Sequence, residues 1–140
     1  TTVWAGPLAT QFLGDLGAEV IKVESCAYPD MLRGFAAPPA SSPGERFWDK
    51  GGYFPTLNRN KHGITLDLRS SQGKDAFRAL VRIADVVIEN FSLRVMRNFG
   101  LDYPALRAVK PDLIMVSMPG YGATGPYRRR IGTEMRTRPE

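Results

Sequence analysis

Apolar residues recur along the chain at two spacings, one typical of helices and the other typical of strands. The helical spacing predicts two longer helices, at 7–16 and 71–83, and two shorter helical pieces, at 95–99 and 102–109. Short apolar and β-branched runs predict four strands, at 19–24, 63–68, 85–89 and 112–117. Strands that alternate with helices across short turns indicate a parallel α/β sheet with flanking helices. Ligands of such sheets bind beyond the carboxyl ends of the strands.

Residues that favour helix ends lie where the periodic segments begin and stop. Pro7 suits the first turn of a helix, where its missing N–H costs no hydrogen bond. Gly17 follows the last periodic residue of the first helix and is expected to end it. Ser70 and Ser71 stand before the second long helix, where a serine hydroxyl caps free backbone N–H groups.

A long segment without periodicity, residues 25–54, separates the first two predicted strands. It is rich in proline and glycine, as loops are. It also carries five aromatic residues, Phe35, Phe47, Trp48, Tyr53 and Phe54. A loop of this length in a compact domain is uncommon and usually functional. We expect this aromatic loop to be ordered against another surface that the 140 residues do not include.

Length and composition fit one domain of a cytoplasmic protein. The 140 residues are 43% hydrophobic, which suffices for one core, and every apolar stretch is too short to cross a bilayer. The first residue is Thr1 and not Met, so we interpret the chain as part of a longer protein. Cys26 is the lone cysteine, which favours a reducing compartment, and His62 is the lone histidine, which argues against a metal site.

The net charge of +5 favours an anionic partner, either nucleic acid or a phosphorylated small molecule. The densest basic cluster, at 128–130, follows a glycine- and proline-rich loop and not a helix face. Zinc-finger spacings, helix-turn-helix signatures and aromatic RNA-binding motifs are missing from the sequence. A phosphorylated small molecule is therefore the favoured partner, and neither a nucleic acid nor a membrane is expected.

Three polar or small-residue segments could carry chemistry. The turn at 3–7 opens a helix whose N–H groups could face a phosphate, although a packing turn is the commoner use. The basic stretch at 58–62 is interpreted as a solvated loop. Glu89, Asn90 and Phe91 end a predicted strand, where an amide and an aromatic ring could bind a purine, although asparagine in a turn is more often structural. The sequence lacks nucleotide-binding glycine motifs and a nucleophile elbow.

Four segments, taken together, resemble the class III CoA-transferases, also called the CaiB/BaiF family. They are WAGPLATQFLGDLGAEVIKVE at 4–24, LNRNKHGITLDLRSSQGK at 57–74, ADVVIENF at 84–91 and FGLDYPALRAVKPDLIMVSMPGYGATGPY at 99–127. They follow the family's order and cover almost the whole chain. The α-methylacyl-CoA racemases are relatives of this family.

The resemblance implies a fold, a ligand and a partner. The chain would be the amino-terminal, CoA-binding part of a Rossmann-like large domain, which forms an interlocked homodimer. The substrates would be an acyl-CoA and a carboxylate acceptor, and no metal is implied. The residues that match CoA contacts of the family are Trp4, Ala5, Leu66, Asp67, Leu68, Arg69, Asn90, Phe91, Arg97 and Asn98. Among them, Arg69 is the expected phosphate contact, and Trp4 and Ala5 are expected beside the thioester.

The resemblance also implies how the parent enzyme would work. CoA moves between carboxylic acids through an aspartyl anhydride and then an aspartyl-CoA thioester. None of the aspartates of this chain matches that nucleophile, so it is expected after Glu140 and this fragment is expected to be inactive. Glu134 matches an acidic neighbour of the active site. Thr133 stands where the racemases have their catalytic histidine, which disfavours a racemase. A racemase and a non-catalytic CoA-binding fragment remain the alternatives.

Overall fold

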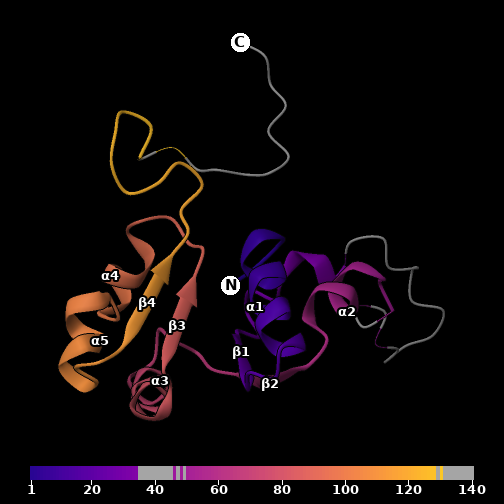
Figure 1. Cartoon of the computed structure of the whole chain (residues 1–140), viewed down its shortest axis with the longest axis horizontal. Coiled ribbons are helices and arrows are strands. Elements are labelled where there is room, and N and C mark those ends of the chain that lie inside the picture. The colour runs from indigo at the N-terminus through magenta and orange to yellow at the C-terminus, as the bar shows by residue number, and fades with distance from the viewer. Residues whose placement is uncertain (35–45, 47, 49, 129, 131–140) are drawn as a thin grey trace. The chain divides into compact units, whose positions relative to one another are not determined.

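The computed structural model describes residues 1–34, 46, 48, 50–128 and 130. The chain divides into two compact units, Thr1–Leu66 and Asp67–Glu140, and each is described by itself. Each unit contains one pair of parallel strands with helices beside it (Figure 1). The predicted class, parallel strands flanked by helices, is therefore confirmed, and the strands are hydrogen-bonded two by two.

The first unit is built around strands β1, Val20–Glu24, and β2, Lys61–Thr65. They pair in parallel, from Val20 opposite Lys61 to Glu24 opposite Thr65. Its helices are α1, Ala5–Asp15, the short 3₁₀ helix η1, Met31–Arg33, and α2, Tyr53–Asn58. Helix α1 packs against α2, and the buried side chains Leu32 and Leu57 form the small apolar core.

The second unit is built around strands β3, Val86–Glu89, and β4, Ile114–Ser117, which pair in parallel in direct register. Its helices are α3, Ser71–Ile83, α4, Val95–Phe99, and α5, Tyr103–Val109. One core fills this unit. It contains the buried residues Val81, Met96, Leu101, Leu106 and Leu113.

The predicted helix ends are confirmed. Gly17 follows α1 with φ +98°, a left-handed conformation that glycine adopts without steric cost. The Ser70 hydroxyl accepts a hydrogen bond of 3.0 Å from the N–H of Gly73 in the first turn of α3. Strand β2 begins two residues before the predicted start and ends at Thr65, so Leu66 to Leu68 lie in the connection to α3.

The interpretation of residues 25–54 as a loop without regular structure is wrong at two places, because η1 and the beginning of α2 lie within it. Both elements escape a periodicity search, since three and six residues are too few to show one. Phe35 and Phe47 lie outside the described residues. Phe54 is half-buried, and the guanidinium of Arg33 lies 3.6 Å from the centre of its ring. Part of the aromatic segment is thus ordered against its own unit.

The apolar stripe of α1 faces outward in this unit. Phe12, Leu13 and Leu16 are exposed, whereas Gly6, Pro7, Thr10 and Gln11 are buried. Thr10 satisfies its hydroxyl by donating to the carbonyl oxygen of Gly6 at 2.9 Å. The spacing therefore predicted the helix correctly, while its buried side is made of small and polar residues. None of the helices in the described part of the chain is long and apolar enough to span a membrane.

Candidate functional site

The carboxyl ends of β3 and β4 carry a buried polar group. Glu89 is the last residue of β3 and lies opposite Ser117, the last residue of β4. One carboxylate oxygen of Glu89 accepts a hydrogen bond of 2.7 Å from the N–H of Phe91, and the other accepts one from the Ser117 hydroxyl. Glu89 is only 6% exposed. The turn that these bonds hold in place lies at the carboxyl ends of the strands, where parallel sheets bind ligands.

Asn90 and Phe91, the predicted purine contacts, form this turn. Both residues are half-buried. Phe91 packs against the core of the unit together with Leu68, another predicted site residue. Phe91 therefore has a structural role in addition to the predicted one, since part of its ring surface is used in packing.

Arg69, the predicted phosphate contact, lies on the turn before α3. Its guanidinium donates to the carboxylate of Asp67 at 3.0 Å, and its backbone N–H donates to the same oxygen at 3.0 Å. The hydrogen bonds from Arg69 lower the pKa of Asp67 below its usual value. The side chain of Arg69 is 57% exposed, so an anion from solvent can reach it.

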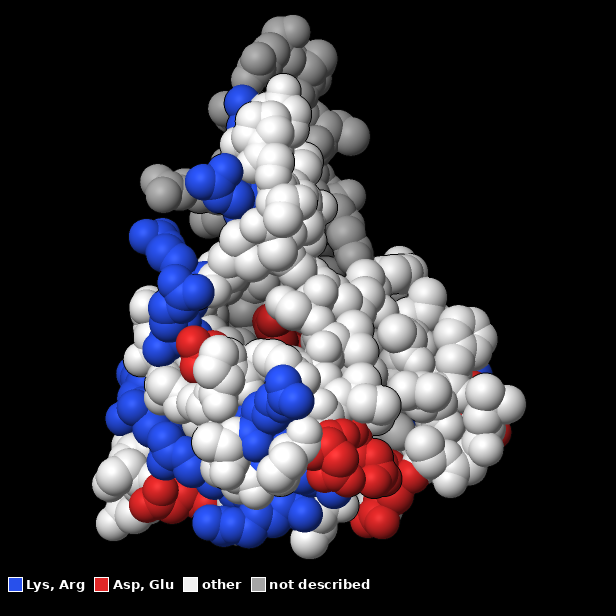
Figure 2. Space-filling view, turned by 60° about the vertical axis from the view of Figure 1, so that its left-hand side comes forward, with Lys and Arg blue, Asp and Glu red and all other residues white. Residues whose placement is uncertain are grey.

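The remaining predicted contacts of the second unit lie on α4. Arg97 and Asn98 are exposed, and Arg97 approaches Asp102 at 3.8 Å. Lys and Arg side chains are interspersed with acidic ones on the face seen in Figure 2. The predicted contacts on α4, Arg97 and Asn98, are open to solvent.

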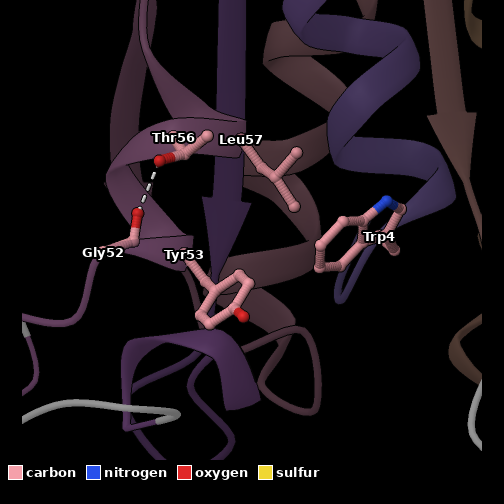
Figure 3. A pocket seen from close by; sticks show the side chains of 5 residues that line it. All are labelled: Trp4, Gly52, Tyr53, Thr56 and Leu57. Atoms are coloured by element: carbon pink, nitrogen blue, oxygen red, sulfur yellow. Dashed lines mark hydrogen bonds between the residues drawn. The ribbon is translucent and has the colours of Figure 1, made fainter.

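Trp4 and Ala5 belong to the first unit, at the start of α1. Trp4 precedes the helix and is 41% exposed. Its ring centroid lies 5.8 Å from that of Tyr53, and the two rings border an open hollow of about 340 Å³ (Figure 3). Gly52, Thr56 and Leu57 complete the lining, which is mostly apolar. Sequence reasoning singled out Trp4 but missed the contribution of Tyr53 from the segment interpreted as a loop.

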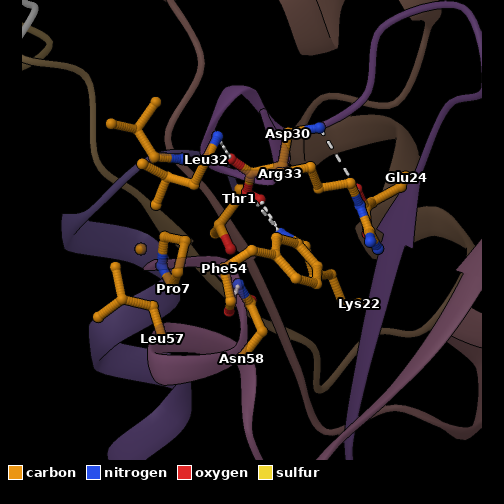
Figure 4. Close-up of polar contacts among 12 residues, drawn as sticks. Thr1, Pro7, Lys22, Glu24, Asp30, Leu32, Arg33, Phe54, Leu57 and Asn58 are labelled. Atoms are coloured by element: carbon orange, nitrogen blue, oxygen red, sulfur yellow. Dashed lines mark hydrogen bonds and ion pairs between the residues drawn. The ribbon is translucent and has the colours of Figure 1, made fainter. Parts of the chain in front are cut away.

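The first unit also holds a buried ion pair that the sequence did not reveal. The Nζ of Lys22 lies 2.9 Å from the Asp30 carboxylate, with 5% and 0% of the two side chains exposed. Lys22 also donates to the carbonyl oxygen of Thr1 at 2.9 Å (Figure 4). The Asp30 carboxylate accepts from the backbone N–H groups of Val3 and Leu32. The pair therefore connects β1, η1 and the segment that leads into α1.

A second ion pair lies beside the first. Glu24, at the end of β1, accepts two hydrogen bonds from the Arg33 guanidinium, of 2.7 and 3.0 Å (Figure 4). Burial raises the pKa of Glu24, but its hydrogen bonds with Arg33 and the charge of Lys22 outweigh this and lower it overall. Arg33 in turn lies over the Phe54 ring, a cation–π contact.

Lys61 contradicts the interpretation of residues 58–62 as a solvated loop. It begins β2, and its Nζ donates to the carbonyl oxygens of Pro7 and Leu57 and to the side-chain oxygen of Asn58, at 2.7 to 3.1 Å. Burial, helped by the charge of Lys22, lowers the pKa of Lys61 to about 8. Lys61 joins β2 to α1 and α2 and is a structural residue.

Most aspartates of the described part of the chain form ion pairs. Six of them form ion pairs with a nearby lysine or arginine: Asp15, Asp30, Asp67, Asp75, Asp102 and Asp112. Asp49, Thr133 and Glu134 lie outside the described residues. Among the described residues, no three His, Cys, Asp or Glu side chains converge on a metal position.

The predicted site residues are thus divided between the two units. Trp4, Ala5 and Leu66 belong to the first unit, and the other seven described residues belong to the second. Sequence reasoning named Glu89 only as part of a motif and missed Ser117. One feature of the sequence could have indicated Glu89: it is an acidic residue at the end of an otherwise apolar strand, and such a residue is expected to lie beside the core.

Comparison with known proteins identifies the family. The model of CoA-transferase family III matches residues 1–138. The chain belongs to CoA-transferase family III. It is 45% identical over 126 residues to a succinate–glutarate CoA-transferase of Agrobacterium fabrum, covering 89% of this chain and 31% of that protein. It is 41% identical over 128 residues to the alpha subunit of a succinyl-CoA–L-malate CoA-transferase of Chloroflexus aurantiacus, covering 91% and 28%.

A solved structure agrees with the fold. The crystal structure of a CaiB/BaiF family protein from Brucella suis matches with a TM-score of 0.83 at 47% sequence identity, over 94% of this chain and 34% of that one. The chain spans about a third of the length of its relatives. The resemblance noted in the sequence is therefore confirmed, and the relatives are enzymes that transfer CoA.

Proposed function

We propose that the protein to which this chain belongs moves CoA between an acyl-CoA and a free carboxylic acid, and that these residues carry its CoA-binding part. The observation that carries the proposal is the 45% identity with a succinate–glutarate CoA-transferase over nearly the whole chain. The acids named for that relative and for the relative from Chloroflexus aurantiacus are dicarboxylic acids. Succinyl-CoA as donor, with glutarate and L-malate as acceptors, is therefore the first combination to test.

In this proposal CoA binds through the second unit. The exposed Arg69 guanidinium supplies a cation for a phosphate of CoA, at some cost to its present pair with Asp67. Asn90 and Phe91 lie at the carboxyl ends of β3 and β4, where ligands of parallel sheets bind. Four further residues stay predicted contacts of CoA: Leu66, Leu68, Arg97 and Asn98. Trp4 and Ala5 stay predicted for the thioester end, and the apolar hollow beside Trp4 supports that assignment.

The aspartyl-CoA mechanism is part of the proposal. None of the aspartates of this chain matches the nucleophile that the family resemblance implies. This supports a nucleophile elsewhere in the protein, with Glu134 as its predicted neighbour. The interlocked homodimer, the Rossmann-like large domain and the cytoplasmic location stay predictions.

The test is transfer of CoA by the natural-length protein. Succinyl-CoA and a labelled carboxylate are incubated with the enzyme, and the labelled acyl-CoA is separated by chromatography. Hydroxylamine or borohydride added during turnover should trap an aspartyl thioester on the protein. Racemisation of a branched acyl-CoA without any exchange of CoA would contradict the proposal and support the racemase alternative. Binding of CoA with neither reaction would support the non-catalytic alternative.

A further inference from the structure

Glu89 is a buried acid whose contacts all lie at the edge where CoA is proposed to bind. Its side chain accepts hydrogen bonds from the N–H of Phe91, at 2.7 Å, and from the hydroxyl of Ser117. Its own carbonyl oxygen accepts from the N–H of Met118 at 2.9 Å. Residue 89 therefore holds both the chain that leaves β3 and the chain that leaves β4.

Burying the Glu89 carboxylate costs free energy, and packing of the core does not require an acid at this position. A carboxylate that is 6% exposed loses most of its hydration. In the described part of the chain it accepts hydrogen bonds from an amide and a hydroxyl, and none of the ion pairs found there includes it. An apolar side chain would fill the space without this cost. What the carboxylate provides, and an apolar group does not, is a fixed position for the N–H of Phe91.

We propose that Glu89 is a positioning residue that fixes the turn at Asn90 and Phe91 for CoA; this rests on the function proposed above. Glu89 precedes Asn90 directly, and its side chain bonds to the residue that follows Asn90. The backbone of Asn90 is therefore held from both sides. Without the carboxylate, the turn has more conformations open to it, and only a fraction of the molecules presents Asn90 for binding.

The experiment measures the dissociation constant of CoA by calorimetry on the natural-length protein and its variants. The wild type and Asn90→Ala come first, because they test the CoA site without reference to Glu89. Failure of the wild type to bind CoA overturns the proposed function and this inference together. Weaker binding by Asn90→Ala combined with unchanged binding by Glu89→Ala overturns this inference alone.

Glu89→Ala should weaken CoA binding about tenfold, the effect of losing roughly one good hydrogen bond. The double variant of Glu89 and Asn90 should bind CoA no more weakly than Asn90→Ala does, because both changes act through the same contact. Losses that multiply in the double variant would show that Glu89 acts on the whole fold, and they would overturn the proposal.

Glu89→Gln is the conservative rescue. The amide oxygen of glutamine can accept from Phe91, and its NH₂ group can donate to the Ser117 hydroxyl, so binding should stay within about twofold of the wild type. A loss as large as that of Glu89→Ala would contradict positioning by these two bonds. Asp85→Asn makes the same acid-to-amide change at an exposed residue just before β3 and should leave CoA binding unchanged.

Ser117→Ala keeps the test decisive if Glu89→Ala does not fold. It removes one of the two hydrogen bonds to the Glu89 carboxylate and leaves the one from Phe91. We expect CoA binding to weaken about threefold, with no further effect when Asn90→Ala is present. An unchanged dissociation constant for Ser117→Ala would then overturn the proposal.

Discussion

Replacing Gly73 by alanine would place a methyl group against the backbone of the turn that carries Arg69. A Cβ atom on Gly73 would lie 2.0 Å from the carbonyl oxygen of Asp67 and 2.6 Å from its carbonyl carbon. Ordinary contacts of such atoms are above 3 Å, so the turn has to move by roughly 1 Å. The same methyl group would lie 3.0 Å from the Ser70 hydroxyl oxygen that caps α3.

Two effects of this substitution oppose each other. Alanine is the better helix former by about 1 kcal/mol, which alone would stabilise α3. Overpacking against a backbone that cannot rotate away costs about 3 kcal/mol, and a weakened serine cap costs about 1 kcal/mol more. We therefore expect Gly73→Ala to lower the free energy of unfolding by about 2–3 kcal/mol. It should also weaken CoA binding, because the turn of Arg69 is displaced.

The measurement is urea unfolding of the natural-length protein, followed by circular dichroism. Gly63→Ala is the matched control: Gly63 lies in β2, and a Cβ atom there would meet nothing within 4 Å. We expect this control to change the free energy of unfolding by less than about 1 kcal/mol. A Gly73→Ala protein as stable as the wild type would show that the close approach to Asp67 does not constrain the turn.

Four further predictions follow from the contacts described. Arg69→Ala should weaken CoA binding about tenfold to a hundredfold in calorimetry. Arg78→Ala removes an arginine that is paired with an aspartate on α3, and it should leave CoA binding unchanged. Equal losses of CoA binding in the two variants would refute the phosphate contact of Arg69. Asp30→Asn leaves the Lys22 ammonium buried without its counter-charge and should cost about 3 kcal/mol in urea unfolding; a loss below about 1 kcal/mol would show that this pair is dispensable. Lys61 has a folded pKa of about 8 against 10.5 in the unfolded chain, so the folded state binds fewer protons and stability should rise between pH 8 and 10.5. Lys61→Met should lack this rise, and an identical rise in that variant would assign it to other groups. Finally, the 140 residues alone should transfer no CoA from labelled acyl-CoA to any carboxylate, and turnover that is lost on mutating one of their aspartates would place the nucleophile within them.

Elements set by local chemistry were predictable from the sequence. The Ser70 cap and the left-handed Gly17 mark two helix ends because each depends on one residue and its immediate neighbours. Strands β3 and β4 were visible as short apolar runs between turn residues. Their parallel pairing followed from the helices that connect them.

Features that depend on distant partners were not predictable. The buried side of α1 consists of small and polar residues, Gly6, Pro7, Thr10 and Gln11, so the apolar stripe predicted the helix but not its orientation. Lys61 was interpreted as part of a solvated loop because charge usually indicates solvent, and the sequence did not mark Lys22 as buried. Their partners, Asp30 and the carbonyl oxygens around Lys61, are brought near only by the fold. Of the candidate site, the positions at strand ends were predictable, whereas the bonds of Glu89 to Phe91 and Ser117 were not.

The first unit buries an ion pair and few hydrophobic side chains, and this affects how its stability changes with temperature. Of the seven hydrophobic side chains buried in the described part of the chain, only Leu32 and Leu57 belong to this unit. Exposure of apolar surface raises the heat capacity on unfolding, and exposure of polar surface lowers it. Unfolding of the Thr1–Leu66 unit should therefore carry a smaller heat-capacity increment per residue than unfolding of Asp67–Glu140, with a flatter stability curve. Hydrogen exchange measured over a range of temperatures would show this as a weaker temperature dependence of protection in β1 and β2 than in β3 and β4.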